Sequence, residues 1–274
     1  MMVFPRRSAV YMLLVGALVL FLGPFAWLLD TALKAPSELR VLPIHWWPHH
    51  LSLNNFRDAL TQIDYLGYAR NSLTIATLYA VLVTLASAWA GYGFARLNAP
   101  GKRMIFNVLL STMMLPQILT LIPTYLLFAK LHLTNTYMPW VLWGLSGAPY
   151  LIFLFRQFFS NMPKELEEAA IVDGCGQIRI FWRIFLPQSW PVIATSLILS
   201  FSWTWGDFVA PALLLDDNHT TLAVKLAYGY VNEHGSPLWN LVAAGAVMYV
   251  VPVLALFLIV QRGFVTGVAT SGLK

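Results

Sequence analysis

Charged residues are scarce in this sequence. Only 11% of its 274 residues are Asp, Glu, Lys or Arg, while 58% are hydrophobic. A soluble domain carries about 25% charged residues, so this composition excludes an ordinary soluble fold and indicates a membrane protein surrounded by lipid. The formal net charge is +5, and the basic residues are distributed between long apolar runs. We therefore expect no nucleic-acid partner.

The chain also lacks common signatures of catalysis. It contains no GxxxxGK[ST] phosphate loop, so it cannot hold ATP by that device, and neither HExxH nor GxSxG occurs. Cys175 is the sole cysteine, so no disulfide can form within the chain. We expect no catalytic residue and no cofactor in this chain.

Three histidines, His45, His49 and His50, lie in a polar segment beside Trp46 and Trp47. Their spacing does not place them on one helical face, and no cysteine is near, so we expect no metal site. The tryptophan pair is typical of the aromatic belt at a membrane surface.

Long windows without Asp, Glu, Lys or Arg define the predicted fold. Each has at least 19 residues, and roughly 20 residues of helix cross the hydrocarbon core. We therefore predict an all-α membrane protein with six transmembrane helices. The windows are Ser8–Leu29, Asn71–Ala95, Met104–Ala129, Tyr137–Phe155, Ile184–Gly206 and Gly235–Gln261.

The distribution of Lys and Arg predicts the orientation of these spans. One side holds eleven of them and the other holds six. Because cytoplasmic loops carry the excess of basic residues, the first side is expected to be cytoplasmic, together with both termini. The six on the outer side are Lys34, Arg40, Arg57, Arg70, Lys130 and Lys225.

An acidic segment between the fourth and fifth windows lies on the predicted cytoplasmic side. Pro163 suits the first turn of a helix, and the carboxylates that follow are favoured by the positive end of the helix dipole. Gly174 and Gly176 are expected to end this helix, which is too short to cross a bilayer. An amphipathic helix lying among lipid headgroups, with Arg179 and Arg183 near anionic lipid, is the alternative. Three glutamates on the polar face favour a protein partner instead.

The segment resembles the EAA signature of permease subunits in bacterial ABC importers that depend on a solute-binding protein. The resemblance rests on Glu168, Ala169, Ala170, Asp173, Gly174 and Leu186-Pro187, with Cys175 in place of the usual alanine. It implies a type I importer permease fold in the bacterial inner membrane, with residues 160–188 as a cytoplasmic coupling loop. It also implies that the helix docks into an ATPase subunit, which would bind ATP and Mg. The expected docking residues are Glu165, Glu167, Glu168, Ala169, Ala170, Asp173 and Gly174.

The resemblance extends along nearly the whole chain, which is expected to form a single domain over residues 1–274. The glycine-rich ending Gln261–Lys274 is similar to the carbohydrate branch of the family, in which this chain resembles the smaller permease of the maltose-type importers. The implied partners are a second permease and an extracytoplasmic solute-binding protein. Residues 30–70 would form the first outer loop, and residues 216–238 an outer loop facing the binding protein.

Trp203, Trp205 and Asp207 are candidates for the substrate path. Aromatic faces stack on sugar rings, although tryptophans at a membrane surface also form interfacial belts. An aspartate at membrane depth is costly and would face a cavity or partner, whereas at the interface it costs little. The family usually has Trp-Asn where this chain has Trp205-Gly206.

The expected function is that of the permease subunit of an ATP-driven sugar or oligosaccharide importer. Permeases of the same family for an amino acid, a polyamine or an oxyanion form one alternative. A secondary transporter driven by an ion gradient is another, and the charge-free windows disfavour it because such proteins usually carry ionisable groups within their spans. A membrane enzyme is disfavoured by the missing motifs.

Overall fold

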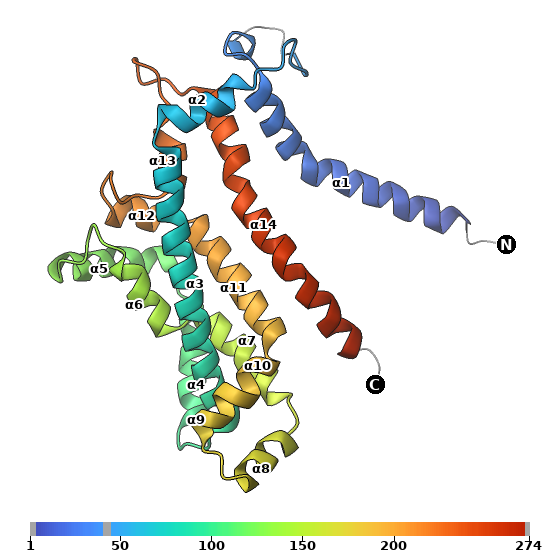
Figure 1. Ribbon diagram of the computed structural model, residues 1–274, viewed down its shortest axis with the longest axis vertical. Coiled ribbons are helices and arrows are strands. Elements are labelled where there is room, and N and C mark those ends of the chain that lie inside the picture. The colour runs from blue at the N-terminus through green and yellow to red at the C-terminus, as the bar shows by residue number, and fades with distance from the viewer. Residues whose placement is uncertain (1–3, 41–44, 272–274) are drawn as a thin grey trace. The chain divides into compact units, whose positions relative to one another are not determined.

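A computed structural model describes residues 4–40 and 45–271 of the chain (Figure 1). These residues form helices, together with one isolated antiparallel β-bridge between Val231 and Pro237. The all-α prediction is confirmed. The last three residues of the glycine-rich ending, 272–274, lie outside the described residues.

The chain divides into two compact units. The first comprises Met1–Tyr68 and Val224–Pro252, and the second comprises Ala69–Ala223 and Val253–Lys274. The first unit contains α1 (Phe4–Leu33), η1 (Glu38–Arg40), α2 (Asn54–Gln62) and the beginning of α14 (Trp239–Ser271). The predicted outer loop over residues 30–70 is thus partly helical. Three of the described helices cross the unit boundaries: α3 (Tyr65–Arg96), α13 (Leu222–Tyr228) and α14.

The second unit contains most of α3 and the helices between it and α13. They are α4 (Lys102–Thr112), α5 (Gln117–Lys130), α6 (Met138–Ser146), α7 (Pro149–Ser160), α8 (Glu165–Val172), α9 (Gln177–Ile180), α10 (Leu186–Gln188), α11 (Trp190–Trp205) and α12 (Val209–Leu214). A π-helical turn, η2 (Phe181–Phe185), links α9 to α10.

Four helical stretches among the described residues are long and apolar enough to cross a membrane. A fifth is obtained when the bent pair Gln177–Gln188 and Trp190–Trp205 is counted as one span. In α1, the large apolar side chains from Val10 to Phe25 are exposed by 50 to 74%, as expected of a helix in contact with lipid or another subunit. The four long apolar stretches are Ser8–Leu33, Tyr65–Arg96, Met138–Ser160 and Trp239–Ile259.

The third predicted span, Met104–Ala129, is wrong as a single helix. It is divided into α4 and α5, of 11 and 14 residues. The break lies at Pro116, which precedes α5 with ψ 127°. Proline has no N–H to continue a preceding helix, and it disfavours the helical conformation of the residue before it. Charge counting does not detect this break because the window stays apolar across it.

The fifth predicted span, Ile184–Gly206, is bent rather than straight. The helices on either side of Ser189 differ in direction by 79°, and they are long and apolar enough to cross a membrane only when Gln177–Gln188 and Trp190–Trp205 are counted as one span. Pro187 and Pro191 each lack the N–H that a continuous helix would use. The buried Ser189 hydroxyl donates instead to the Phe185 carbonyl at 2.5 Å.

An aromatic core lies where α3, α7, α9 and η2 meet in the second unit. Tyr92 packs edge-on against Phe159 and Phe185, with ring centroids 6.1 and 5.1 Å apart, and its ring is tilted against Phe181 at 5.3 Å. Ala170 of α8 is buried in the same cluster. The acidic segment is therefore packed against the spans rather than extended away from them.

Gly91 allows α3 to approach α7 closely. A Cβ at this position would lie 2.6 Å from the Phe155 Cβ and 2.9 Å from the Arg156 backbone nitrogen. We expect Gly91→Ala to lower the free energy of unfolding by about 1–3 kcal/mol, because neither helix backbone can move aside easily. Thermal unfolding of the purified protein measures the change. Gly93→Ala is the matched control, since a Cβ there meets nothing within 4 Å, and an equal effect at both positions would contradict the prediction.

Candidate functional site

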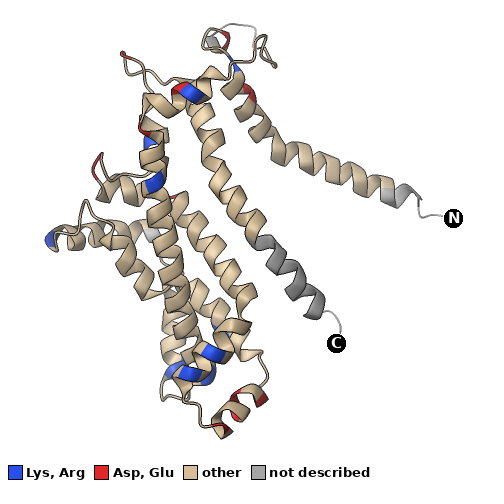
Figure 2. Cartoon of the chain, viewed as in Figure 1, with Lys and Arg blue, Asp and Glu red and all other residues tan. Residues whose placement is uncertain are grey.

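The coupling segment, which we define as residues 160–188, contains the short helix α8 near its beginning. Glu165, Glu167 and Glu168 occupy its first turn, as the sequence predicts. Figure 2 shows the acidic residues of α8 near the basic residues of the helices that follow it. The segment thus brings both signs of charge to the same end of the second unit.

Gly174 ends α8 in a Schellman motif. Its φ is +75°, its N–H donates to the Ile171 carbonyl at 2.9 Å, and the Cys175 N–H donates to the Ala170 carbonyl at 2.9 Å. These bonds satisfy carbonyls that a helix end leaves unpaired. A Cβ at Gly174 would meet nothing within 4 Å, so the backbone conformation requires the glycine. Gly176 has φ −77° and ψ 160°, which any residue adopts.

The predicted docking residues divide between two faces of the coupling segment. Glu167 is partly buried, with its carboxylate 3.7 Å from the Arg96 Nη1 atom, and Ala170 lies in the aromatic core. The other five are accessible to a partner protein. They are Glu165, Glu168, Ala169, Asp173 and Gly174.

Exposed apolar side chains beside these acids were missed by sequence reasoning. Val172 is 87% exposed, and Ile171, Ile178 and Trp182 are each at least half exposed. The sequence signal that could have indicated them is the β-branched pair Ile171 and Val172 in the last turn of the acidic helix α8. Apolar groups surrounded by charged ones are typical of protein contact surfaces.

A hollow of about 490 Å³ adjoins this surface, between the end of α8 and η2. Its charged lining consists of Arg179 and Arg183, with Trp182 between them in the sequence. The coupling segment therefore offers acidic, apolar and basic areas within a short length of chain. Such a mixed surface suits a folded protein better than an anionic lipid surface, which would repel the glutamates.

A second candidate site is a cavity of about 770 Å³ in the second unit. Its aromatic lining comes from three helices, through Tyr79 of α3, Trp140 and Trp143 of α6, and Trp203 of α11. Among the described residues that line it, Asp207 carries the charge. A cavity of this size, with aromatic faces and few polar groups, is suited to a small organic solute.

The three predicted substrate-path residues are placed differently. Trp203 lines the cavity and is 47% exposed. Trp205 is only 2% exposed and stacks on Phe201 with ring centroids 5.7 Å apart, and it is not among the described lining residues. The structure therefore brings Trp203 and Asp207 together at the cavity and places Trp205 in the packing behind it.

Asp207 lies just beyond the end of α11 and caps α12. Its Oδ1 accepts hydrogen bonds from the Val209 N–H at 3.0 Å and the Ala210 N–H at 3.2 Å. Burial raises the pKa of the Asp207 carboxyl, while these two N–H groups act against the rise. The carboxylate thus has a structural role at the helix terminus in addition to lining the cavity.

Residues 216–238 fall in both units, and each part has its own contacts. In the second unit, the Asp216 carboxylate and the His219 ring lie 2.7 Å apart, and the hydrogen bond from His219 lowers the pKa of Asp216. In the first unit, the Asn232 carboxamide accepts from the His234 and Ser236 N–H groups and closes a turn. Both parts present exposed polar side chains.

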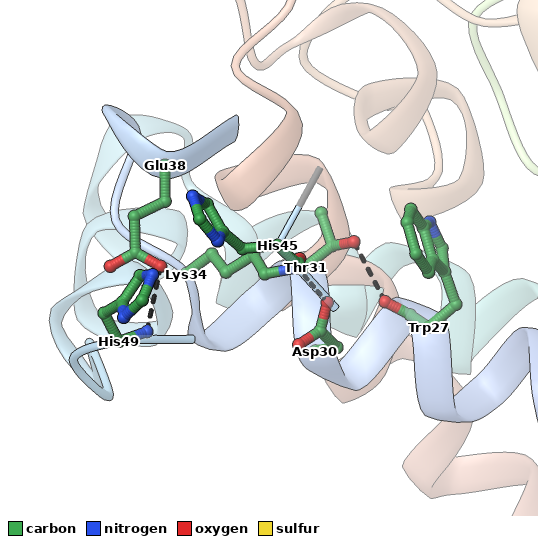
Figure 3. Close-up of polar contacts among 7 residues, drawn as sticks. All are labelled: Trp27, Asp30, Thr31, Lys34, Glu38, His45 and His49. Carbon is green, nitrogen blue, oxygen red and sulfur yellow. Dashed lines mark hydrogen bonds and ion pairs between the residues drawn. The ribbon is translucent and has the colours of Figure 1, made fainter. Parts of the chain in front are cut away.

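Two of the three histidines considered above, His45 and His49, lie near a buried ion pair (Figure 3). Lys34 pairs with Asp30 one turn earlier in α1, and its ammonium also donates to the His45 carbonyl at 2.6 Å. The His49 backbone N–H donates to Glu38, which lowers the pKa of that carboxyl. The His45 and His49 rings meet edge-on with centroids 4.5 Å apart. In the described residues, no three His, Cys, Asp or Glu side chains are arranged to hold a metal ion.

Comparison with known proteins identifies the family. The family model described as "Binding-protein-dependent transport system inner membrane component" matches residues 66–268. The chain belongs to this family. The permease is therefore a multi-pass subunit of the inner membrane that works with a solute-binding protein, and it is not an enzyme.

Curated relatives cover nearly the whole permease. It is 32% identical to the sulfoquinovosyl glycerol transport system permease protein SmoH of Agrobacterium fabrum, over 98% of this chain and 93% of that protein. It is also 32% identical to the melibiose/raffinose/stachyose import permease protein MelC of Bacillus subtilis, over 92% and 91%. The arabinooligosaccharides transport system permease protein AraQ of Halalkalibacterium halodurans is 34% identical, over 83% and 81%.

A solved structure confirms the fold. The permease matches a chain of a bacterial ABC transporter involved in the import of the acidic polysaccharide alginate, with a TM-score of 0.81, covering 95% of this chain and 97% of that one. Sequence identity is 19%, so the likeness concerns the fold. The predicted ABC importer permease fold is thereby confirmed.

Proposed function

We propose that this permease is the membrane subunit of an ATP-driven importer of sugars or oligosaccharides. The observation that carries the proposal is the exposed surface of the coupling segment, where Glu168, Asp173 and Val172 are accessible while Ala170 fixes α8 in the core. A helix held in this way transmits an applied force instead of swinging freely. The partner would be a cytoplasmic ATPase that holds ATP and Mg.

The proposed mechanism is mechanical. Closure of two ATPase subunits moves α8, and the attached spans change the side from which the cavity is open. A second permease subunit completes the substrate path, and the solute-binding protein delivers the solute to the outer surface, which includes residues 216–238. The permease itself contributes no chemistry to ATP hydrolysis.

A sugar substrate is supported by two lines of evidence. The relatives named above transport, by their names, arabinooligosaccharides or melibiose, raffinose and stachyose. The cavity combines aromatic faces with the Asp207 carboxylate, and sugars present apolar C–H faces together with hydroxyl donors. Amino acids, polyamines and oxyanions remain alternative outcomes of the transport test.

The test is uptake by proteoliposomes that contain the permease with its second permease, its ATPase and its binding protein. We expect ATP-dependent accumulation of a radiolabelled oligosaccharide. Transport by the permease alone under a proton or sodium gradient would instead identify a secondary transporter.

Trp203→Ala tests the cavity in the same assay. Removal of one stacking face should raise the KM for the sugar by about two- to tenfold, since aromatic stacking contributes roughly 0.5–1.5 kcal/mol. Trp190→Ala is the matched control, because Trp190 is exposed at the other end of the same helix and is not among the described lining residues. Equal KM values for the two variants would show that Trp203 and the cavity it lines do not bind the substrate.

A further inference from the structure

The last turns of α3 carry two residues, Tyr92 and Arg96, whose burial is not explained by membrane topology. A basic residue that only anchors a loop at the membrane surface stays solvated. The Arg96 side chain is instead 6% exposed, and Tyr92 is 2% exposed. Both side chains point into the coupling segment from a helix that is remote from it in the sequence.

Arg96 contacts two elements that flank the turn before α8. Its Nε and Nη2 atoms donate to the Phe159 carbonyl at 3.1 and 2.7 Å, and Nη2 also donates to the Met162 carbonyl at 2.5 Å. Phe159 lies in the last turn of α7, and Met162 lies in the turn that follows it. On the other side, Nη1 lies 3.7 Å from the Glu167 carboxylate of α8. The planar guanidinium thus joins the end of α7 to α8.

Arg96 also lies over an aromatic ring of the coupling segment. Its guanidinium carbon is 4.9 Å from the centroid of Phe185 in η2. A planar guanidinium can stack and donate several hydrogen bonds at once, whereas an ammonium group cannot reproduce this arrangement. The contact therefore depends on arginine and not only on a positive charge.

Tyr92 makes the corresponding contact one turn earlier. Its hydroxyl donates to the Gln177 side-chain oxygen at 2.5 Å, and Gln177 is the first residue of α9. Arg96 thus contacts the coupling segment at α8, and Tyr92 contacts it at α9. The exposed docking surface thus lies on a segment whose inner side is held by α3 at two points.

The same helix reaches the cavity. Tyr79 of α3 lines it, and Tyr79 and Arg96 are 17 positions apart, which is about 25 Å along a continuous helix. The Thr84 and Ser196 hydroxyls, 2.8 Å apart, link α3 to α11 between these two ends. A rigid helix therefore connects the coupling segment with the cavity.

We propose that α3 is a coupling arm of the permease and that Arg96 and Tyr92 are its positioning residues. Displacement of α8 and α9 by the ATPase passes through these two side chains into α3, and along α3 to the cavity wall. Chain connectivity alone would direct the force only to α7 and α11. The inference rests on the proposed function, because it requires an ATPase at the coupling segment.

The test uses the complete importer in proteoliposomes and measures three quantities in each variant: sugar uptake, ATP hydrolysis, and the ratio of ATPase to permease in the purified complex. Tyr92→Phe removes only a hydroxyl, and Arg96→Lys keeps the positive charge. Arg96→Met removes both the charge and the N–H donors of the guanidinium. Arg103→Met is the control, since Arg103 is exposed near the start of α4.

We expect assembly and ATP hydrolysis to stay within about twofold of the unmodified importer while Arg96→Met lowers uptake by at least about tenfold, because the loss of even one of its charge-assisted hydrogen bonds corresponds to that factor. ATP consumed per sugar should rise by the same factor, with smaller increases for Arg96→Lys and Tyr92→Phe. Arg103→Met should leave this ratio unchanged.

An unchanged ratio of ATP to sugar in all three variants would overturn the proposal, whether uptake is retained or falls together with hydrolysis. If Arg96→Met fails to assemble, Tyr92→Phe decides the question alone, because it preserves the ring packing. Failure of the proposed function would be recognised separately, since the unmodified importer would then show no ATP-dependent uptake.

Discussion

Glu168→Lys is expected to abolish ATP-coupled uptake while the permease still inserts into the membrane. Glu168 is exposed on α8, so the substitution disturbs no packing within the chain. Reversal of a docking charge places like charges together in the interface with the ATPase, which should weaken association by on the order of a hundredfold. Co-purification of the ATPase with the permease measures the association, and proteoliposome uptake measures the consequence.

The matched control for this variant is Asp58→Lys. Asp58 is an exposed carboxylate on the short helix α2, on the predicted outer side of the membrane. The Asp58→Lys substitution changes the net charge by the same amount as Glu168→Lys but leaves the coupling segment unaltered. ATPase association that is equal in the two variants would refute docking through Glu168.

Gly174→Val is expected to reduce uptake by at least about tenfold through the backbone. A left-handed conformation costs an ordinary residue roughly 1–2 kcal/mol, and a β-branched side chain is the least tolerant of it. The Schellman motif would open, and the exposed Ile171, Val172 and Asp173 would lose their fixed positions. Uptake and ATPase association report this loss, whereas overall thermal stability should change little because the turn is exposed.

Gly176→Val separates backbone conformation from side-chain size. Gly176 is also exposed, and its extended backbone accepts any residue, so we expect uptake within about twofold of the unmodified importer. Similar loss in both variants would mean that bulk in the segment, rather than the left-handed turn, interferes with docking.

The sequence predicted the helical class, the apolar windows and the position of α8 because these features depend on neighbouring residues. Apolar run length, proline before a helix and glycine after it are local signals. The same local reasoning failed at the third window, where Pro116 divides an uninterrupted apolar run into α4 and α5. It also missed the 79° bend at Ser189 within the fifth span.

The candidate site was only partly predictable for a related reason. The sequence predicts seven docking residues as one group, but Glu167 is partly buried beside Arg96 and Ala170 lies in the aromatic core. Burial on a short helix depends on what packs against it, and the packing partners come from α3 and α7. Exposed Val172 and buried Trp205 were unpredictable in the same way.

By itself, the sequence determined that this protein is a helical membrane subunit with a short acidic helix between two apolar stretches, since composition and hydropathy are additive along the chain. Only the tertiary structure decided which side of that helix is available to a partner, and that Arg96 and Tyr92 hold it from a remote span. The hydroxyl of Tyr92 and the carboxamide of Gln177 are separated by 85 residues, yet they share a hydrogen bond. Such a contact exists only after the helices pack, because nothing in the local pattern of either residue specifies the other.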